Sequence, residues 1–171
     1  MQGQSVEQLA AGLQAAMRAE HQGYHFYTMA MKTTEDEKGR DIFSQLAEEE
    51  KEHLAFLRKQ YKSIVETGLP NTTVDLGKPL DLSGASPIFS DRIRARLGSA
   101  HFEMTALSVG IQLELDAVRV YTRFADDAAV PAVEKFYREL AEWERGHYKA
   151  LLAQEESLKE DYWSGNGFAP F

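Results

Sequence analysis

The chain has 171 residues, with 19 lysine and arginine residues against 27 aspartate and glutamate residues, so its formal net charge at pH 7 is −8. This acidic balance argues against nucleic-acid binding, which needs clustered positive charge. The absence of cysteine excludes disulfides, thiolate metal sites and a cysteine nucleophile in this sequence. No stretch approaches the roughly 20 apolar residues of a membrane-spanning helix, and the first residues do not form a signal peptide. We therefore expect a cytoplasmic protein that binds neither membranes nor nucleic acid.

Four long segments carry apolar residues at helical spacing, and they predict four helices at about residues 5–34, 35–67, 99–127 and 132–159. Thr34 to Glu37 is typical of a capping box at the start of the second helix. Residues 68–98 are rich in proline and glycine, which predicts a long connection with one short helix near 90–97. An aromatic tail at 161–171 is expected to contact a partner or second subunit, or else to fold back over the bundle.

The long connection has a topological consequence. A helix of about 28 residues is ~42 Å long, and a connection of about 30 residues can cover that length. The second and third helices can then run parallel, while short loops make the other neighbours antiparallel. We therefore expect an all-α, ferritin-like four-helix bundle over residues 1–160, with a long crossover between helices 2 and 3.

An internal repeat carries the chemistry. A shift of 94 residues places Glu20 on Glu114, Tyr27 on Tyr121, and the pattern Leu-Ala-Glu-x-Glu-x-x-His at 46–53 on the same pattern at 140–147. Glu and His in Glu-x-x-His lie about one helical turn apart and share a face. The repeat thus predicts six metal ligands in one bundle centre: Glu20, Glu50, His53, Glu114, Glu144 and His147.

Four carboxylates and two imidazoles are the ligand set of di-iron and di-manganese carboxylate proteins. Two divalent cations would neutralise the four negative charges, whereas four buried carboxylates without metal are costly unless some are protonated. Oxygen and nitrogen ligands favour two iron ions (Fe²⁺/Fe³⁺), with manganese or zinc as substitutes. Tyr27 and Tyr121 are candidate catalytic residues beside the metals, and the alternative for both is core packing with a satisfied hydroxyl.

Other polar and aromatic positions receive simpler interpretations. Three acidic residues beside Lys51 are expected on a solvated helix face: Glu48, Glu49 and Glu52. Three histidines without a Glu three residues earlier are expected in surface or packing positions: His21, His25 and His101. Glu103 shares a helix face with Glu114, so a role in an iron route is the alternative to a structural one. Trp143 is expected to pack rather than to conduct electrons.

With these motifs, the chain resembles the rubrerythrin family of the ferritin-like superfamily over about residues 5–159. The resemblance implies a role for each ligand: bridging for Glu50 and Glu144, terminal for Glu20 and Glu114, and capping of one metal each for His53 and His147. It also implies reduction of hydrogen peroxide or dioxygen in oxidative-stress defence, and a homodimer.

Two departures from the family pattern bear on this function. Ala117 stands where peroxide-reducing members carry a further Glu, and the absence of cysteine means no rubredoxin-type electron carrier in the sequence. Electrons would then come from a separate donor protein. Two alternatives stay open: a ferroxidase or iron-storage protein, and a non-catalytic helical interaction module with a vestigial metal site.

Overall fold

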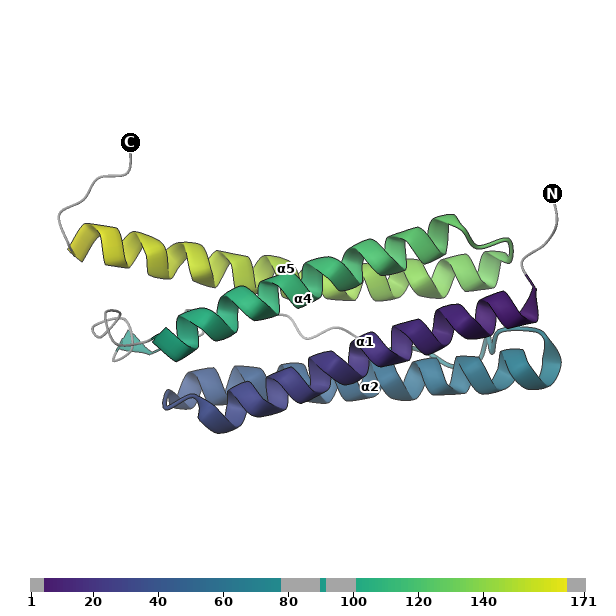
Figure 1. Cartoon of the computed structure of the whole chain (residues 1–171), viewed down its shortest axis with the longest axis horizontal. Helices are drawn as coiled ribbons and strands as arrows, with labels where there is room; N and C mark the ends of the chain where they lie inside the picture. Colours follow the sequence, from purple (N-terminus) through teal and green to yellow (C-terminus); the bar gives the residue numbers. More distant parts are fainter. Residues whose placement is uncertain (1–4, 78–89, 92–100, 166–171) are drawn as a thin grey trace.

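The computed structural model describes residues 5–77, 90–91 and 101–165 of the chain. With the labels of Figure 1, its long helices are α1 (Val6–Thr33), α2 (Glu37–Thr67), α4 (His101–Asp126) and α5 (Pro131–Gly165). The described residues contain no strand, which confirms the all-α prediction. None of the described helices is both long and apolar enough to cross a membrane.

The directions of the helices follow the expected bundle topology. In Figure 1, α1 runs antiparallel to α2, and α4 runs antiparallel to α5. The same view shows α2 and α4 running in the same direction, with α1 and α4 as neighbours from the two pairs. Parallel α2 and α4 require a connection that returns along the bundle, as the ferritin-like arrangement does.

The start of α2 differs from its prediction. Asp36 is the N-cap, and its carboxylate accepts a 3.0 Å hydrogen bond from the N–H of Gly39. Thr34 instead ends α1, where its own N–H donates to the carbonyl of Ala30 at 2.9 Å. The predicted capping box at Thr34 is therefore wrong, because that residue already serves as a C-cap and aspartate is an equally good N-cap.

The described parts of the crossover contact both ends of α2. Gln60 accepts from the N–H of Asn71 and donates to its carbonyl, both at 2.9 Å, near the end of the helix. At the other end, the N–H of Ser90 donates to Asp36 at 3.2 Å, and the Ser90 hydroxyl donates to the same carboxylate. Asn71 and Ser90 therefore lie at opposite ends of α2. Apart from Ser90 and Asp91, the short helix expected near 90–97 lies outside the described residues.

The helix ends agree with the predicted bounds within two residues, except at the end of α5. This helix continues to Gly165, so the first residues of the expected aromatic tail are helical. Residues 166–171 lie outside the described part of the chain. At the end of α2, Gly68 has φ 75°, a left-handed conformation that glycine adopts without steric cost.

Buried apolar side chains form two clusters, one towards each end of the bundle. One includes Leu13, Leu57, Tyr121 and Leu140. The other includes Tyr27, Phe43, Leu46, Leu107 and Leu151. Along α1, the buried Glu20 lies between Leu13 of the first cluster and Tyr27 of the second. The polar residues of the candidate site thus form a layer between two apolar ones.

Candidate metal centre

The six residues predicted as ligands come together in the interior of the bundle. Each helix contributes at least one of them: Glu20 from α1, Glu50 and His53 from α2, Glu114 from α4, and Glu144 and His147 from α5. None exposes more than 5% of its surface. Burial of this many acidic groups needs compensation by positive charge or by protons.

The donor atoms divide into two overlapping groups that could each hold a metal ion. Glu50, Glu114, Glu144 and His147 offer atoms within 4.8 Å of one another, and so do Glu20, Glu50 and His53. Glu50 belongs to both groups, which is the position that a bridging carboxylate would take.

Glu144 also faces both halves of the site. Its Oε1 lies 2.9 Å from Nδ1 of His53, and its Oε2 lies 3.3 Å from Nδ1 of His147. Nδ1 of His53 is also 3.1 Å from Oε2 of Glu20, and Nδ1 of His147 is 3.7 Å from Oε1 of Glu114. Both imidazoles therefore direct Nδ1 towards the carboxylates.

The two tyrosines of the repeat each contact the other half of the site. The hydroxyl of Tyr27 donates to Oε1 of Glu114, and the hydroxyl of Tyr121 donates to Oε1 of Glu20. Both side chains are fully buried. Burial, followed by the charges of nearby carboxylates, raises the pKa of both tyrosines well above the ordinary value, so both stay protonated donors. These two hydrogen bonds can orient the carboxylates of Glu114 and Glu20. A catalytic role of the tyrosines stays a prediction.

The absence of a side chain at Gly23 makes room for the shared carboxylate. A Cβ built on Gly23 would lie 2.8 Å from Cδ and from Oε2 of Glu50, closer than real Cβ contacts. The repeat places Ala117 at the equivalent position in the other half. Sequence reasoning missed Gly23, and its difference from Ala117 in the repeat was the only available signal.

The pKa shifts of the buried groups show how their charges balance one another. Burial and then the neighbouring carboxylates raise the pKa of Glu50 well above its ordinary value, and they raise the pKa of Glu114 to about 8. Burial opposes ionisation of Glu144, but the His53 and His147 imidazoles outweigh it and hold the pKa of Glu144 below its ordinary value. Burial likewise lowers the pKa of His53, yet the carboxylates of Glu144 and Glu20 raise it to about 10. The raised pKa values keep protons on Glu50, Glu114 and His53, and these protons balance negative charge that bound cations would otherwise balance.

Unpartnered atoms indicate that the site is built for cations. Within the described residues, Oε1 and Oε2 of Glu144 and Nδ1 of His147 are buried and make no well-aligned hydrogen bond, although an imidazole nitrogen lies within 2.9 or 3.3 Å of each oxygen. Buried polar atoms are rarely left in this state. A carboxylate between two inward-facing imidazole nitrogens, with a second carboxylate shared by both groups, fits a pair of divalent cations.

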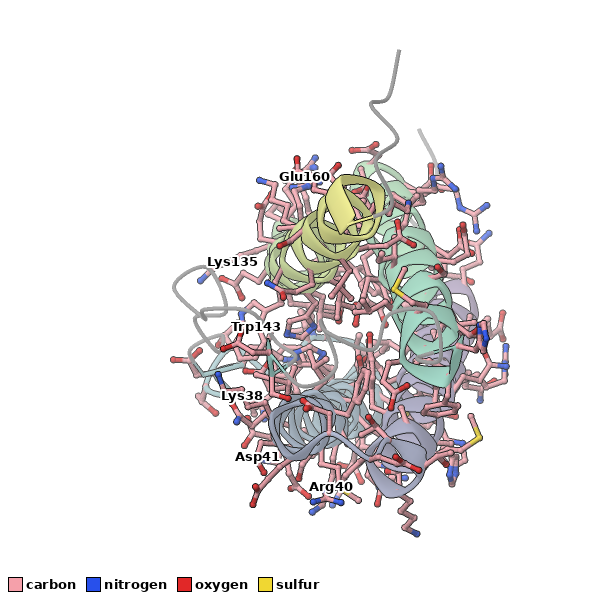
Figure 2. All side chains as sticks on the ribbon, turned by 90° about the vertical axis from the view of Figure 1, so that its left-hand side faces the viewer. Lys38, Arg40, Asp41, Lys135, Trp143 and Glu160 are labelled. Atoms are coloured by element: carbon pink, nitrogen blue, oxygen red, sulfur yellow. The ribbon has the colours of Figure 1, made fainter. Side chains whose placement is uncertain are left out.

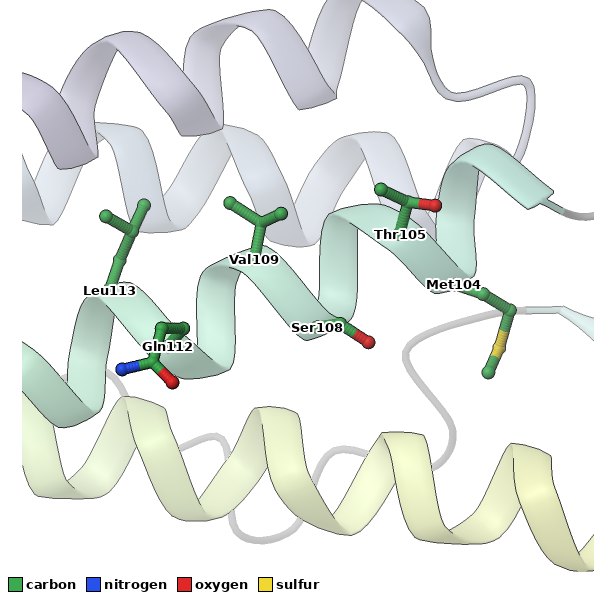
Figure 3. Close-up of a pocket in the computed structure, with 6 residues that line it drawn as sticks. All are labelled: Met104, Thr105, Ser108, Val109, Gln112 and Leu113. Carbon is green, nitrogen blue, oxygen red and sulfur yellow. The ribbon is translucent and has the colours of Figure 1, made fainter.

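A hollow of about 250 Å³ between α1 and α4 reaches these ligands. Glu20, Glu50, Glu114 and Glu144 line its inner part, and Ala117 is part of its wall. A larger hollow of about 470 Å³ lies on the outer side of α4 (Figure 3). Its lining contains neither acidic nor histidine side chains: Met104, Thr105, Ser108, Val109, Gln112 and Leu113. The candidate metal ligands therefore lie at the smaller hollow, between α1 and α4.

One prediction about the surroundings of the site is wrong. Glu49 is not on a solvated face with its neighbours Glu48 and Glu52, because its side chain is only 12% exposed and Oε2 contacts Nε2 of His147. Glu49 is adjacent to the ligand Glu50 on α2, and at this position its side chain faces α5, where His147 lies. Comparison with Trp143 in the repeat was the signal that could have found it.

The remaining polar positions agree with their simpler interpretations. His21, His25 and His101 are exposed. Glu103 is buried, and its carboxylate accepts from the Thr34 hydroxyl at 3.1 Å and from the Glu35 N–H at 3.4 Å. It therefore joins α4 to the turn between α1 and α2. Trp143 packs with its edge against the His53 ring, as expected.

A comparison of the sequence with protein families returned a match. The rubrerythrin family model matches residues 5–69 and 105–164, which include all six candidate ligands. Searches of curated proteins and of solved structures returned no match. The family match covers both halves of the repeat and all four described long helices, so the chain belongs to the rubrerythrin family, a family of di-iron proteins.

Proposed function

We propose that this protein is a non-haem di-iron oxidoreductase that reduces hydrogen peroxide or dioxygen in oxidative-stress defence. The observation that carries the proposal is the buried, duplicated set of four carboxylates and two inward-facing imidazoles, reached by the hollow between α1 and α4. Two Fe(II) ions held by these residues would supply the two electrons that reduce peroxide to water, and the separate electron donor would return the ions to Fe(II).

The four carboxylates and two imidazoles would hold this pair with oxygen and nitrogen donors. Glu50 and Glu144 have the positions of bridging carboxylates, because each lies against ligands of both halves. Tyr27 and Tyr121 hold the terminal carboxylates Glu114 and Glu20 by donating to one oxygen of each. The other oxygen of Glu20 lies 3.1 Å from Nδ1 of His53, on the side where the cations would bind.

The hollow between α1 and α4 is the proposed path for the oxidant. Its volume of about 250 Å³ exceeds the ~30 Å³ share of one water molecule in the liquid several-fold, so a small oxidant fits with room for solvent. Leu113, Ala117 and Val120 give it apolar walls that limit how much water enters with the substrate. Replacement of Ala117 by a larger residue would narrow this path.

Electron supply and assembly are further parts of the proposal. The sequence holds no cysteine for an iron–sulfur or rubredoxin-type carrier, which supports a separate electron-donor protein. A homodimer and a cytoplasmic location also stay predictions. Light scattering of the purified protein tests the dimer.

The first test is anaerobic loading of the metal-free chain with Fe(II), followed by oxidation with peroxide or dioxygen. We expect about two irons per chain, faster oxidation by peroxide, and turnover with a chemical reductant. Glu50→Ala with Glu144→Ala should abolish both loading and turnover. The matched control is Glu48→Ala with Glu142→Ala, which removes exposed carboxylates two residues before each ligand and should leave both unchanged. Turnover retained by the ligand variant would contradict the proposal.

Ala117 favours a second candidate, oxidation of Fe(II) for storage or transfer, because the further Glu of peroxide-reducing members is absent there. Fast oxidation by dioxygen and uptake of many irons per chain would support it. A folded chain that binds no iron would support the non-catalytic interaction module instead.

A further inference from the structure

The two halves of the metal centre differ at one repeated position. The shift that places Glu50 on Glu144 and His53 on His147 places Glu49 on Trp143. The residue before each shared carboxylate is therefore an acid in one half and an indole in the other. All six candidate ligands, by contrast, are identical between the halves.

Each of these two residues crosses to the histidine of the other half. Glu49 on α2 contacts Nε2 of His147 on α5. Trp143 on α5 is 6% exposed and packs edge-on against His53 on α2, with ring centroids 4.8 Å apart and an angle of 72°. In the end-on view of Figure 2, Trp143 lies between these two helices. The repeat thus preserves the direction of the contact but changes its chemistry.

The difference between Glu49 and Trp143 changes the surroundings of Nε2, the outer nitrogen of each imidazole. Both rings direct Nδ1 towards the carboxylates, so Nε2 faces away from the cluster. Nε2 of His147 meets a carboxylate, whereas Nε2 of His53 is buried and has no hydrogen-bond partner among the described residues. A carboxylate on the outer N–H fixes the tautomer and orientation of an imidazole and makes its inner nitrogen a stronger donor.

We propose that Glu49 is a positioning residue that makes the two metal positions unequal, so that the half containing His147 binds its divalent cation more tightly. The inference rests on the dimetal site of the proposed function. Glu49 acts through His147 and is outside the ligand set, because it contacts the nitrogen that faces away from the four carboxylates.

Titration of the metal-free chain with Co(II), followed by calorimetry and by visible absorption, tests the inequality. We expect two binding steps of different affinity. Glu49→Gln keeps the size of the side chain but removes its charge, and it should weaken the tighter step about 10–100-fold while leaving the other step in place. Glu48→Gln changes the exposed neighbouring acid and should leave both steps unchanged.

A second measurement needs no variant. In the Zn(II)-loaded chain with ¹⁵N-labelled histidine, the Nε2–H of His147 should give a strongly hydrogen-bonded, downfield proton signal, and that of His53 should not. Two equal binding steps, or two alike Nε2–H signals, would overturn the inference and leave the proposed function intact. Failure of the unaltered chain to bind Co(II) or Zn(II) would instead contradict the dimetal site itself.

Discussion

At the scale of single residues, the candidate metal centre depends on the missing side chain of Gly23 as well as on its ligands. Gly23 leaves the space that the carboxylate of Glu50 occupies, and this carboxylate is shared by the two donor groups. The equivalent Ala117 lines the hollow instead. One missing methyl group on α1 therefore sets how closely a shared ligand approaches the helix.

We expect Gly23→Ala to displace the carboxylate of Glu50 and to weaken metal binding. Its Cβ would lie 2.8 Å from two atoms of that side chain, and overpacking of this kind typically costs about 1–3 kcal/mol. Gly146→Ala is the matched control, because its Cβ meets nothing within 4 Å on an exposed turn of α5. It should be neutral or stabilise the helix by up to about 1 kcal/mol. Metal titration with thermal unfolding of both variants distinguishes them, and equal metal affinity would refute this role of Gly23.

At the scale of elements, the start of α2 joins three parts of the chain. Asp36 caps the helix through Gly39 and accepts two hydrogen bonds from Ser90 of the crossover. Close by, Thr34 and Glu35 donate to Glu103 at the start of α4. The crossover and α4 are thereby attached to the turn that joins α1 and α2.

Asp36→Ala should therefore cost more than loss of an ordinary N-cap. A cap contributes about 1 kcal/mol, and the contacts with Ser90 add to it, so we expect a loss of about 2 kcal/mol in the free energy of unfolding. Urea unfolding of the metal-free chain measures this loss. Asp41→Ala, at an exposed position of the same helix, should change the stability by less than about 0.5 kcal/mol. Equal effects of the two substitutions would show that the cap and its crossover contact contribute little.

At the scale of the whole molecule, the bundle surrounds a layer of ionisable groups with two apolar clusters. Without metal, this layer keeps extra protons: the pKa of Glu114 is raised to about 8 and that of His53 to about 10. Charged side chains such as Lys38, Arg40 and Lys135 lie at the outside of the bundle in the end-on view (Figure 2). The stability of the molecule therefore depends on what balances its interior charge.

We expect the metal-free chain to lose stability as the pH rises from about 5 to 10. The Glu114 contribution is full below its ordinary pKa of 4.5 and is lost as the pH rises through about 8. The His53 contribution is full below 6.5 and is lost through about 10. The lowered pKa of Glu144 adds no change in this window, because its contribution is already full above 4.5.

Bound divalent cations should reduce or reverse this decline, because they replace the protons and bind better as the ligands deprotonate. Thermal unfolding followed by circular dichroism at pH 6, 7.5 and 9, with chelator or with Mn(II), checks both statements. A metal-free chain that gains stability over this range would contradict the assignment of protons to the buried cluster.

The sequence by itself determined the helical fold and the six candidate ligands, because both depend on spacing along one helix and on the repeat. Apolar periodicity identifies a helix without knowledge of its partners, and Glu-x-x-His shares a face whatever surrounds it. Only the tertiary structure decided the contacts between helices. Spacing within α2 could not show that Glu49 reaches His147, nor that Gly23 makes room for Glu50, because each partner lies on another helix. Likewise, Thr34 and Asp36 are both good caps in sequence, and the turn joining α1 to α2 decided between them.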